Sequence, residues 1–458
     1  MDDEADAALL AAFKSEWKRK NALKTKGIKL KKKLLSGGRK KKPIGLHIDF
    51  DSRIMADYFG VVAKDVDGVI TRGVRPRFGS KKFNRRFRMS SKRFCKLHAE
   101  ISHPERGDDF FQTGCDAMGK HGPTTLQKLV AAIRQLAYGT ASDHVEEYTG
   151  VADGTARKAL RHFSKWLDKR YGAKFLGAWT EEAIKKEMAA NETRGFPGML
   201  GSIDCTHWNW RNCPVAWQGQ YHDRGGTKSI VAEAIAGHDM YFWHAFVGAP
   251  GFLNDLNILG RSTLHEHYLN SPAAKIKFVI LDEEFTGAYF LADGIYPGYA
   301  LFMKSVGHPR TRKEKLFAKF HEGCRKDVER AFGRMLAKWH ILGSAARSWY
   351  LVYLKRVWRA CFILHNMTIR DSQKLGEGEV SESDSEDTED EDASSDDDDY
   401  EAGVDFDVRD EEADWNDVMD RLDHMQCQDT HHLLRKKVQE KLWIDEGDDD
   451  EEWEKGCL

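Results

Sequence analysis

Apolar runs of strand length alternate with helical periods between residues 195 and 339, and this is the most regular pattern in the chain. The run before Asp204 predicts a strand that ends at this carboxylate. The β-rich runs 229–237 and 241–248 predict the next two strands of a meander. Further strand candidates are 277–281, 289–292 and 300–306. The pattern predicts an α/β fold with a mixed sheet flanked by helices.

Two helices complete this region. One is predicted from Asn254 to about Leu269, and a later one carries Glu329 at the margin of an apolar face. Three meander strands, a helix, a fourth strand and a late helix fit an RNase H-like sheet. The run 277–281 does not fit this count, and we interpret it as a short extra strand or a hairpin partner.

Upstream, the hydrophobic period is helical from about residue 124 to 167. Ser142 and Asp153 are predicted N-caps of the second and third of three short helices. The third helix has a basic outer face, formed by Arg157, Lys158, Arg161 and Lys165. This outline is typical of a helix-turn-helix that binds DNA. It is also that of the commonest small helical module, so both readings stay open.

Residues 75–93 hold nine Lys/Arg and no acid. Arg85, Arg86 and Arg88 alternate there with phenylalanines. Cations between aromatic rings suit phosphate contact with some base stacking. The alternative is that the phenylalanines pack a small helical subdomain while the cations face water.

The net charge of −2 is the sum of separated blocks. Residues 11–45 carry fourteen Lys/Arg and one acid, whereas residues 381–402 carry thirteen Asp/Glu and no base. This polarity predicts a front that binds polyanions and a solvated acidic tail. The basic clusters also resemble nuclear import signals, which makes the nucleus the expected location.

The chain has no apolar run of about eighteen residues, so we expect no membrane partner. Residues 371–412 have the composition of disorder. A helical stripe returns at Leu433–Trp443, as a docking helix for the core, a second subunit or a partner. The predicted organisation is a basic arm (1–45), a helical DNA-binding region (46–194), the RNase H-like domain (195–370), an acidic linker (371–412) and a docking helix (413–458).

Three acids in this order are the candidate chemistry: Asp204 and Asp293 at predicted strand ends, and Glu329 on a helix. Taken singly, a strand-end aspartate often caps a turn and a helical glutamate often forms a surface ion pair. Together they predict a site for two Mg²⁺ or Mn²⁺ ions, because these ions prefer carboxylate oxygens. Such a pair supports phosphodiester cleavage, with the acids as ligands rather than proton carriers.

Five blocks of the sequence carry a resemblance to a known family. They are Gly201–Trp210, Cys213–Tyr221, Trp243–Asn257, Leu291–Pro297 and Val328–Gly333. These blocks resemble the plant-transposon branch of the Harbinger superfamily (PIF-type). The resemblance extends over roughly residues 80–370, and more weakly over the helix near residues 433–443.

The resemblance implies an RNase H-like DDE nuclease domain behind a helical DNA-binding region. In it, Asp204, Asp293 and Glu329 match the family's metal-binding triad. Asp255 matches a further aspartate that the family pattern places near the metals. The residues leave open whether Asp255 binds metal or caps its helix.

The implied function is that of a transposase, which cuts double-stranded DNA at transposon ends and transfers the 3′-hydroxyl strand to target DNA. The runner-up is a domesticated relative, a nuclear DNA-binding or chromatin adaptor without transposition activity. Related systems pair the nuclease with a separate Myb-like protein. We therefore expect such an accessory partner, together with DNA and homo-oligomers.

Overall fold

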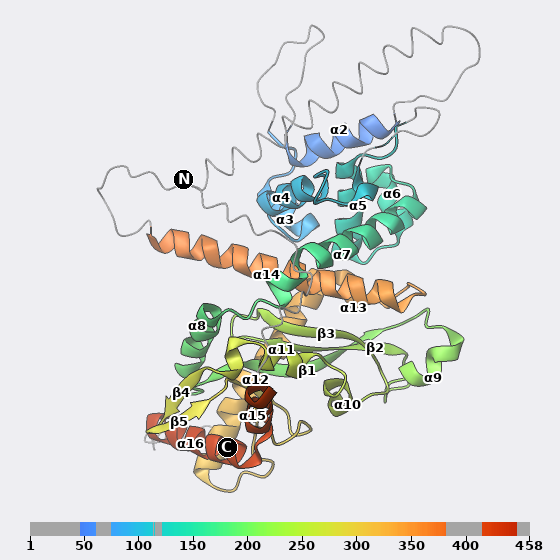
Figure 1. Cartoon of the computed structure of the whole chain (residues 1–458). Coiled ribbons are helices and arrows are strands. Elements are labelled where there is room, and N and C mark those ends of the chain that lie inside the picture. Colours follow the sequence, from blue (N-terminus) through green and yellow to red (C-terminus); the bar gives the residue numbers. More distant parts are fainter. Residues whose placement is uncertain (1–45, 61–74, 113, 115–120, 382–414, 447–458) are drawn as a thin grey trace, which may run out of the picture. The chain divides into compact units, whose positions relative to one another are not determined.

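The computed structural model describes residues 46–60, 75–112, 114, 121–381 and 415–446 (Figure 1). It divides into two compact units. The helical unit comprises the residues up to Leu167 together with Leu336–Ser344, and the sheet unit comprises Asp168–Met335 and the residues from Ala345 onward. The basic arm and nearly all of the acidic tract lie outside the described residues.

The helical unit is built around α5. Its helices are α2 (Leu46–Tyr58), α3 (Ser80–Phe87), α4 (Ser91–Ile101), η1 (Asp109–Phe111), α5 (Thr125–Tyr138), α6 (Ser142–Thr149), the first part of α7 (Asp153–Leu176) and α13 (His340–Gly343). A capping box begins α5, because the Thr124 hydroxyl accepts from the Gln127 amide and the Gln127 side chain accepts from the Thr124 amide. Neither Ser142 nor Asp153 is an N-cap. Each is the first helical residue of its helix, α6 and α7, and the Ser142 hydroxyl donates to Asp153.

The phenylalanines of residues 75–93 pack the interior of this unit. Phe83 and Phe87 are buried with their ring centroids 4.5 Å apart, and they meet Phe94 and Tyr58 at ring-centroid distances of 4.9–5.7 Å. Their edge-to-face and tilted contacts account for the burial of this segment. Of the two readings offered by the sequence, packing holds for these two rings, and Arg85 faces solvent.

The sheet unit contains a five-stranded mixed sheet. Its strands are β1 (Met199–Asn209), β2 (Ser229–Ala236), β3 (Phe242–Pro250), β6 (Tyr289–Ala292) and β7 (Phe302–Lys304), in the spatial order β3-β2-β1-β6-β7. The β1–β2 and β2–β3 pairs are antiparallel, whereas β6 is parallel to both β1 and β7. The predicted meander and the mixed sheet are confirmed.

Both faces of this sheet are buried, as expected for central strands covered by helices. Alternate residues of β6 face opposite sides: Phe290 joins a cluster with residues of α8 and α11, whereas Leu291 joins one with Phe317 of α12. The helices of this unit are the last part of α7, α8 (Glu181–Glu192), η2 (Val215–Trp217), α9 (Gln218–Tyr221), α10 (Asp255–Leu259), α11 (Leu264–Leu269), η3 (Pro272–Ala274), α12 (Arg312–Lys338), α14 (Leu351–Ser381), α15 (Trp415–Gln426) and α16 (Gln428–Glu446).

Two local predictions need adjustment. The single helix expected from Asn254 to about Leu269 is two short ones, α10 and α11, separated by a turn in which Ser262 accepts from the Leu264 amide. The run 277–281 forms β4 (Lys277–Ile280), which pairs with β5 (Glu283–Thr286) outside the main sheet. The hairpin-partner interpretation of that run is thereby confirmed.

The boundary between the units lies within α7, not at residue 195. The helix is continuous, and the following helix α8 packs against β1, so the residues before 195 already contribute to the sheet unit. At the other end, α14 continues past the predicted boundary at residue 370. Its Asn366 side chain bonds both backbone groups of Phe242, which covers the edge strand β3.

The C-terminal helix α16 docks on the protein's own core, beside β4 and β7 (Figure 1). Leu434, Val438 and Leu442 are buried there, whereas Leu433 and Trp443 are exposed. The buried stripe of α16 is therefore narrower than predicted. Of the expected docking partners, the helix packs on the core of the sheet unit. Among the described helices, none is both long enough and apolar enough to cross a membrane.

Candidate active site

Asp204 lies within β1 rather than at its end, because the strand continues to Asn209. The parallel pairing of β1 with β6 stops at Ser202 and Leu291. Asp204 and Asp293 each lie two residues beyond this last pair. Because the two strands are parallel, both residues lie at the same level of the sheet. The strand-end prediction thus holds for Asp293, which follows β6, and is wrong for Asp204, whose strand is extended by its pairing with β2.

Glu329 reaches the same region through α12. Ser202 and Asp204 share a face of β1, and the Ser202 hydroxyl accepts a hydrogen bond of 3.1 Å from the amide of Val328, the neighbour of Glu329. Glu329 itself is exposed, and its carboxylate lies 3.0 Å from the Arg325 guanidinium. The predicted helix position of this acid is confirmed.

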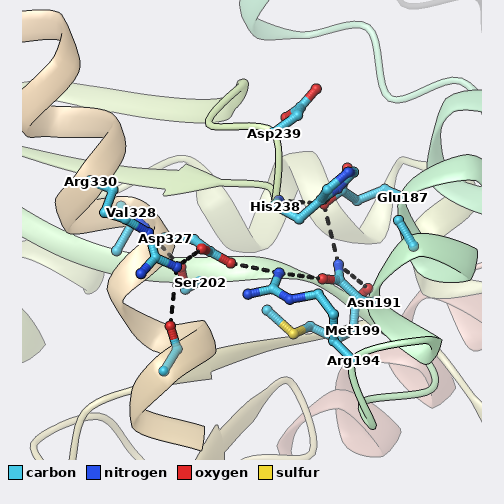
Figure 2. Close-up of polar contacts among 12 residues, drawn as sticks. Glu187, Asn191, Arg194, Met199, Ser202, His238, Asp239, Asp327, Val328 and Arg330 are labelled. Atoms are coloured by element: carbon cyan, nitrogen blue, oxygen red, sulfur yellow. Dashed lines mark hydrogen bonds and ion pairs between the residues drawn. The ribbon is translucent and has the colours of Figure 1, made fainter. Parts of the chain in front are cut away.

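A buried polar network holds α12 against α8 and β1 (Figure 2). Asp327 is only 2% exposed, lies 2.7 Å from the guanidinium of Arg194 and also pairs with Arg330. Arg194 in turn donates to Asn191, whose amide group donates to Glu187 and to the Met199 carbonyl. The residues on either side of Val328 are thereby fixed relative to β1.

Electrostatics links these acids. Burial raises the pKa of Asp204 to about 6; the Cys205 amide and Arg325 oppose this, and the negative charges of Asp255 and Glu329 add to it. Burial also raises the pKa of Asp255, and the charge of Asp293 adds to that shift. The carboxylates are therefore close enough to repel one another, which a bound cation would relieve.

The three predicted ligands are neighbours but do not converge. Among the described residues, the group of His, Cys, Asp and Glu whose ligand atoms all lie within 4.8 Å of one another consists of Glu187 of α8 with His238 and Asp239 of the β2–β3 turn. Asp204, Asp293 and Glu329 form no such group. One oxygen of Asp293 accepts from the Ile295 amide at 2.7 Å, which closes a turn after β6.

Asp255 does not cap α10. Asn254 is the N-cap, and its side chain accepts from the Asn257 amide at 2.9 Å. Asp255 is the first helical residue, and its carboxylate faces the Cys205 thiol. Of the two roles that the sequence left open, capping is therefore excluded.

A cavity of about 530 Å³ opens beside Asp255. Its lining includes His207, Arg224, Phe252 and Ile295. The Phe252 side chain is 70% exposed, which is unusual for an aromatic ring. The cavity therefore offers a cation and an aromatic face next to a carboxylate.

Glu233 was not among the predicted site residues; it is 0% exposed in β2 and pairs across the sheet with Cys205. Burial raises its pKa to about 7; the Ser262 hydroxyl opposes this, and the charge of Asp255 adds to it. The available signal was a single charged residue inside an otherwise apolar run. Ser202, Asp327 and Arg194 were missed because nothing local distinguishes them.

The predicted DNA-binding residues all belong to the helical unit. Arg157, Lys158 and Lys165 are exposed on α7, as predicted, whereas Arg161 of the same predicted face is half-buried. Arg157 forms an ion pair with Asp153. Arg86 and Arg88 are half-buried and lie over the aromatic rings of Tyr58 and Tyr138. The lining of one cavity in this unit includes Arg86.

Fold and site together define an α/β protein with carboxylates on neighbouring parallel strands and on the helix packed against them. Residues 173–376 match the family described as "Plant transposon protein". The predicted resemblance to plant transposon proteins of the Harbinger group is therefore confirmed for the segment that carries Asp204, Asp255, Asp293 and Glu329. The match begins well after residue 80, where the predicted resemblance started.

One curated relative is the protein named Antagonist of Like Heterochromatin Protein 1, from Arabidopsis thaliana. It is 24% identical over 251 residues, which are 54% of this chain and 63% of that protein. The chain thus spans less than two thirds of that relative's length. No solved structure matches the chain.

Proposed function

We propose that this chain is a metal-dependent DNA nuclease of the transposase type. It would cut DNA at transposon ends and transfer the 3′-hydroxyl strand to target DNA. The observation that carries the proposal is the parallel register of β1 and β6, which brings Asp204 and Asp293 to one level beside the helix of Glu329. These acids lie within the segment that matches plant transposon proteins.

The sheet supports an RNase H-like assignment for this unit. Three consecutive strands form an antiparallel meander, and β6 and β7 extend it in parallel on the other side of β1. We identify the acids of β1, the end of β6 and α12 with the DDE triad. The presence of all three favours an active enzyme over an adaptor.

The donor set fits Mg²⁺ or Mn²⁺, because it consists of carboxylates; burial raises the pKa of Asp204 and of Asp255, and the negative charges of neighbouring acids add to both shifts. Asp204, Asp293 and Glu329, with Asp255 as a fourth candidate, would hold the metal. Two such ions would supply activation of the attacking hydroxyl and stabilisation of the leaving oxygen. In the adjoining cavity, Arg224 would contact a phosphate and Phe252 would stack on a base.

The test is nicking of a supercoiled plasmid by the full chain. It should require Mg²⁺ or Mn²⁺ and fall by more than about a hundredfold in Asp204→Asn, Asp293→Asn and Glu329→Gln, because each change removes a charged ligand. Glu284→Gln is the matched control, since that exposed carboxylate of β5 pairs only with Lys277 among the contacts described. Unchanged nicking in the three variants would remove the metal-site assignment.

The second candidate is a Harbinger-derived nuclear DNA-binding or chromatin adaptor without strand transfer. One observation in its favour is the similarity to the protein named Antagonist of Like Heterochromatin Protein 1. The other is that, among the described residues, Asp204, Asp293 and Glu329 form no group whose ligand atoms all lie within 4.8 Å of one another. Metal-independent DNA binding without nicking would favour it. Under both proposals we expect the protein to be located in the nucleus and to form homo-oligomers.

A Myb-like accessory protein is part of the transposase proposal. Basic arms bind any duplex by charge, whereas discrimination among sequences needs contacts in the grooves. We expect weak, largely sequence-independent binding by the isolated chain, sharpened by such a partner. Because the apolar face of α16 is buried against the chain's own core, we propose the acidic tract, residues 381–402, as the dock for this partner. Strong end-specific binding by the chain alone would contradict the partner.

A further inference from the structure

Four helices of the helical unit line a cavity of about 480 Å³. One arginine comes from each of α2, α3 and α5, namely Arg53, Arg86 and Arg134. From α6 come Tyr148 and Glu147. We call this the arginine cavity. Arg53 and Arg134 had no distinguishing feature in the sequence, because they lie in separate segments of ordinary helical composition.

Aromatic rings hold these three guanidinium groups in place. Arg53 and Arg134 lie 4.8 Å and 4.5 Å from the ring centre of Tyr148. Arg86 lies 4.0 Å from the ring centre of Phe78 and donates a hydrogen bond of 2.6 Å to the Tyr58 hydroxyl. Stacking fixes the plane of each guanidinium and leaves most of its N–H donors available to a ligand.

The cavity has an excess of positive charge. Within the part of the chain that the structure describes, Arg53, Arg86 and Arg134 form no ion pair with a carboxylate, and Glu147 is the one acid in the lining. The nearby Asp57 is engaged by the Tyr148 hydroxyl at 2.8 Å and by Arg77. Three guanidinium groups against a single carboxylate match a phosphate, which accepts their forked hydrogen bonds.

The rim of the cavity indicates an extended polyanion rather than a small ligand. Helix α3 places Lys81, Lys82 and Arg85 on the surface next to Arg86, within a segment that carries no acid. On α7, by contrast, Arg157 is already paired with Asp153. A backbone that carries one charge per nucleotide would engage the cavity and its rim together.

We propose that the arginine cavity seats a backbone phosphate of double-stranded DNA and is the main phosphate contact of the helical unit. This inference rests on the proposed function, which it deepens by locating the DNA anchor. It replaces the exposed face of α7 as the principal contact.

The test compares two double variants of the full chain that each remove two positive charges. Binding of a labelled duplex of random sequence is measured over a range of salt concentrations. Arg53→Gln with Arg134→Gln should weaken binding by about tenfold or more and lower the salt slope by about one, because the cavity seats one phosphate. Arg157→Gln with Lys158→Gln should do markedly less. Equal affinity and slope for the wild type and the cavity variant, or a larger loss in the α7 variant, would overturn the proposal.

Two further measurements separate folding from binding. Arg53→Lys with Arg134→Lys keeps the charge but loses the planar fork, so it should recover the salt slope without the full affinity. Inorganic phosphate should raise the unfolding temperature of the wild type and not that of the glutamine variant. If phosphate protects through the cavity while duplex binding is unchanged by the variant, the ligand is another phosphorylated molecule and the DNA assignment is wrong.

The result of these DNA-binding measurements does not depend on the result of the nicking test. Asp204 lies in the sheet unit, so Asp204→Asn should abolish nicking and leave duplex binding intact. Normal duplex binding by the glutamine variant contradicts only the arginine cavity. Normal binding by the wild type without metal-dependent nicking contradicts only the nuclease.

Discussion

The helical unit and the sheet unit gather charge of opposite sign by different means. In the helical unit, guanidinium groups rest on tyrosine and phenylalanine rings that are themselves part of the packing. In the sheet unit, carboxylates lie at the level where two parallel strands stop pairing and one helix crosses them. Like charges held close reduce stability, so a ligand of opposite sign should stabilise either unit. In the functions proposed above, the helical unit would bind the DNA backbone and the sheet unit would perform the chemistry on it.

The largest expected effect comes from breaking the network that fixes α12. Asp327→Ala leaves the guanidinium of Arg194 without its buried partner and should reduce the free energy of unfolding of the sheet unit by about 3–5 kcal/mol. Urea unfolding of the full chain, followed by circular dichroism, measures this loss. Glu322→Ala on the same helix removes a more exposed carboxylate and should cost about 1 kcal/mol or less. Equal losses in both variants would contradict a specific role for the network.

Acid should weaken the sheet unit through His244 of β3. Burial lowers the pKa of His244 to about 3, and the charges of His267 and Arg359 add to this. The unfolded chain binds the proton near pH 6.5 and the folded chain does not, so stability is lost as the pH falls. The free energy of unfolding should drop by up to about 1.4 kcal/mol for each pH unit below about 6.5.

His244→Gln removes this contribution, so the difference in unfolding free energy between wild type and variant should shrink as the pH falls from about 7 to about 5. Urea titrations at a series of pH values provide the measurement. A constant difference across this range would show that His244 takes up its proton in the folded chain as readily as in the unfolded one.

The smallest effect distinguishes the ligands of the two units. Mg²⁺ at about ten times its dissociation constant should stabilise the sheet unit by about 1.4 kcal/mol, because it relieves the repulsion around Asp204. Asp204→Asn should lose this protection, whereas Arg53→Gln with Arg134→Gln should keep it. Thermal unfolding with and without Mg²⁺ measures this protection. Equal protection of the wild type and of Asp204→Asn would contradict Mg²⁺ binding at Asp204.

Much of the sheet unit could be predicted from its sequence. The apolar runs before Asp204 and Asp293, and the β-rich runs between them, indicate strands because each is bounded by turn residues; in the structure these runs are largely buried. The hairpin of β4 and β5 was one of two interpretations of the run 277–281, because that run did not fit the predicted strand count. Helix ends were less predictable: the single helix expected after Asn254 is interrupted at Ser262 by a turn whose bonds involve neighbouring segments.

The sequence by itself determined which segments are strands and helices, and it indicated the candidate acids and the resemblance to plant transposon proteins. Only the tertiary structure decided which residues meet. The level shared by Asp204 and Asp293 depends on strand register, the hold on α12 depends on Arg194 and Asp327, and the arginine cavity collects one side chain from each of three helices. Local periodicity reports which face of an element is buried, whereas contacts between distant segments depend on how those faces pack.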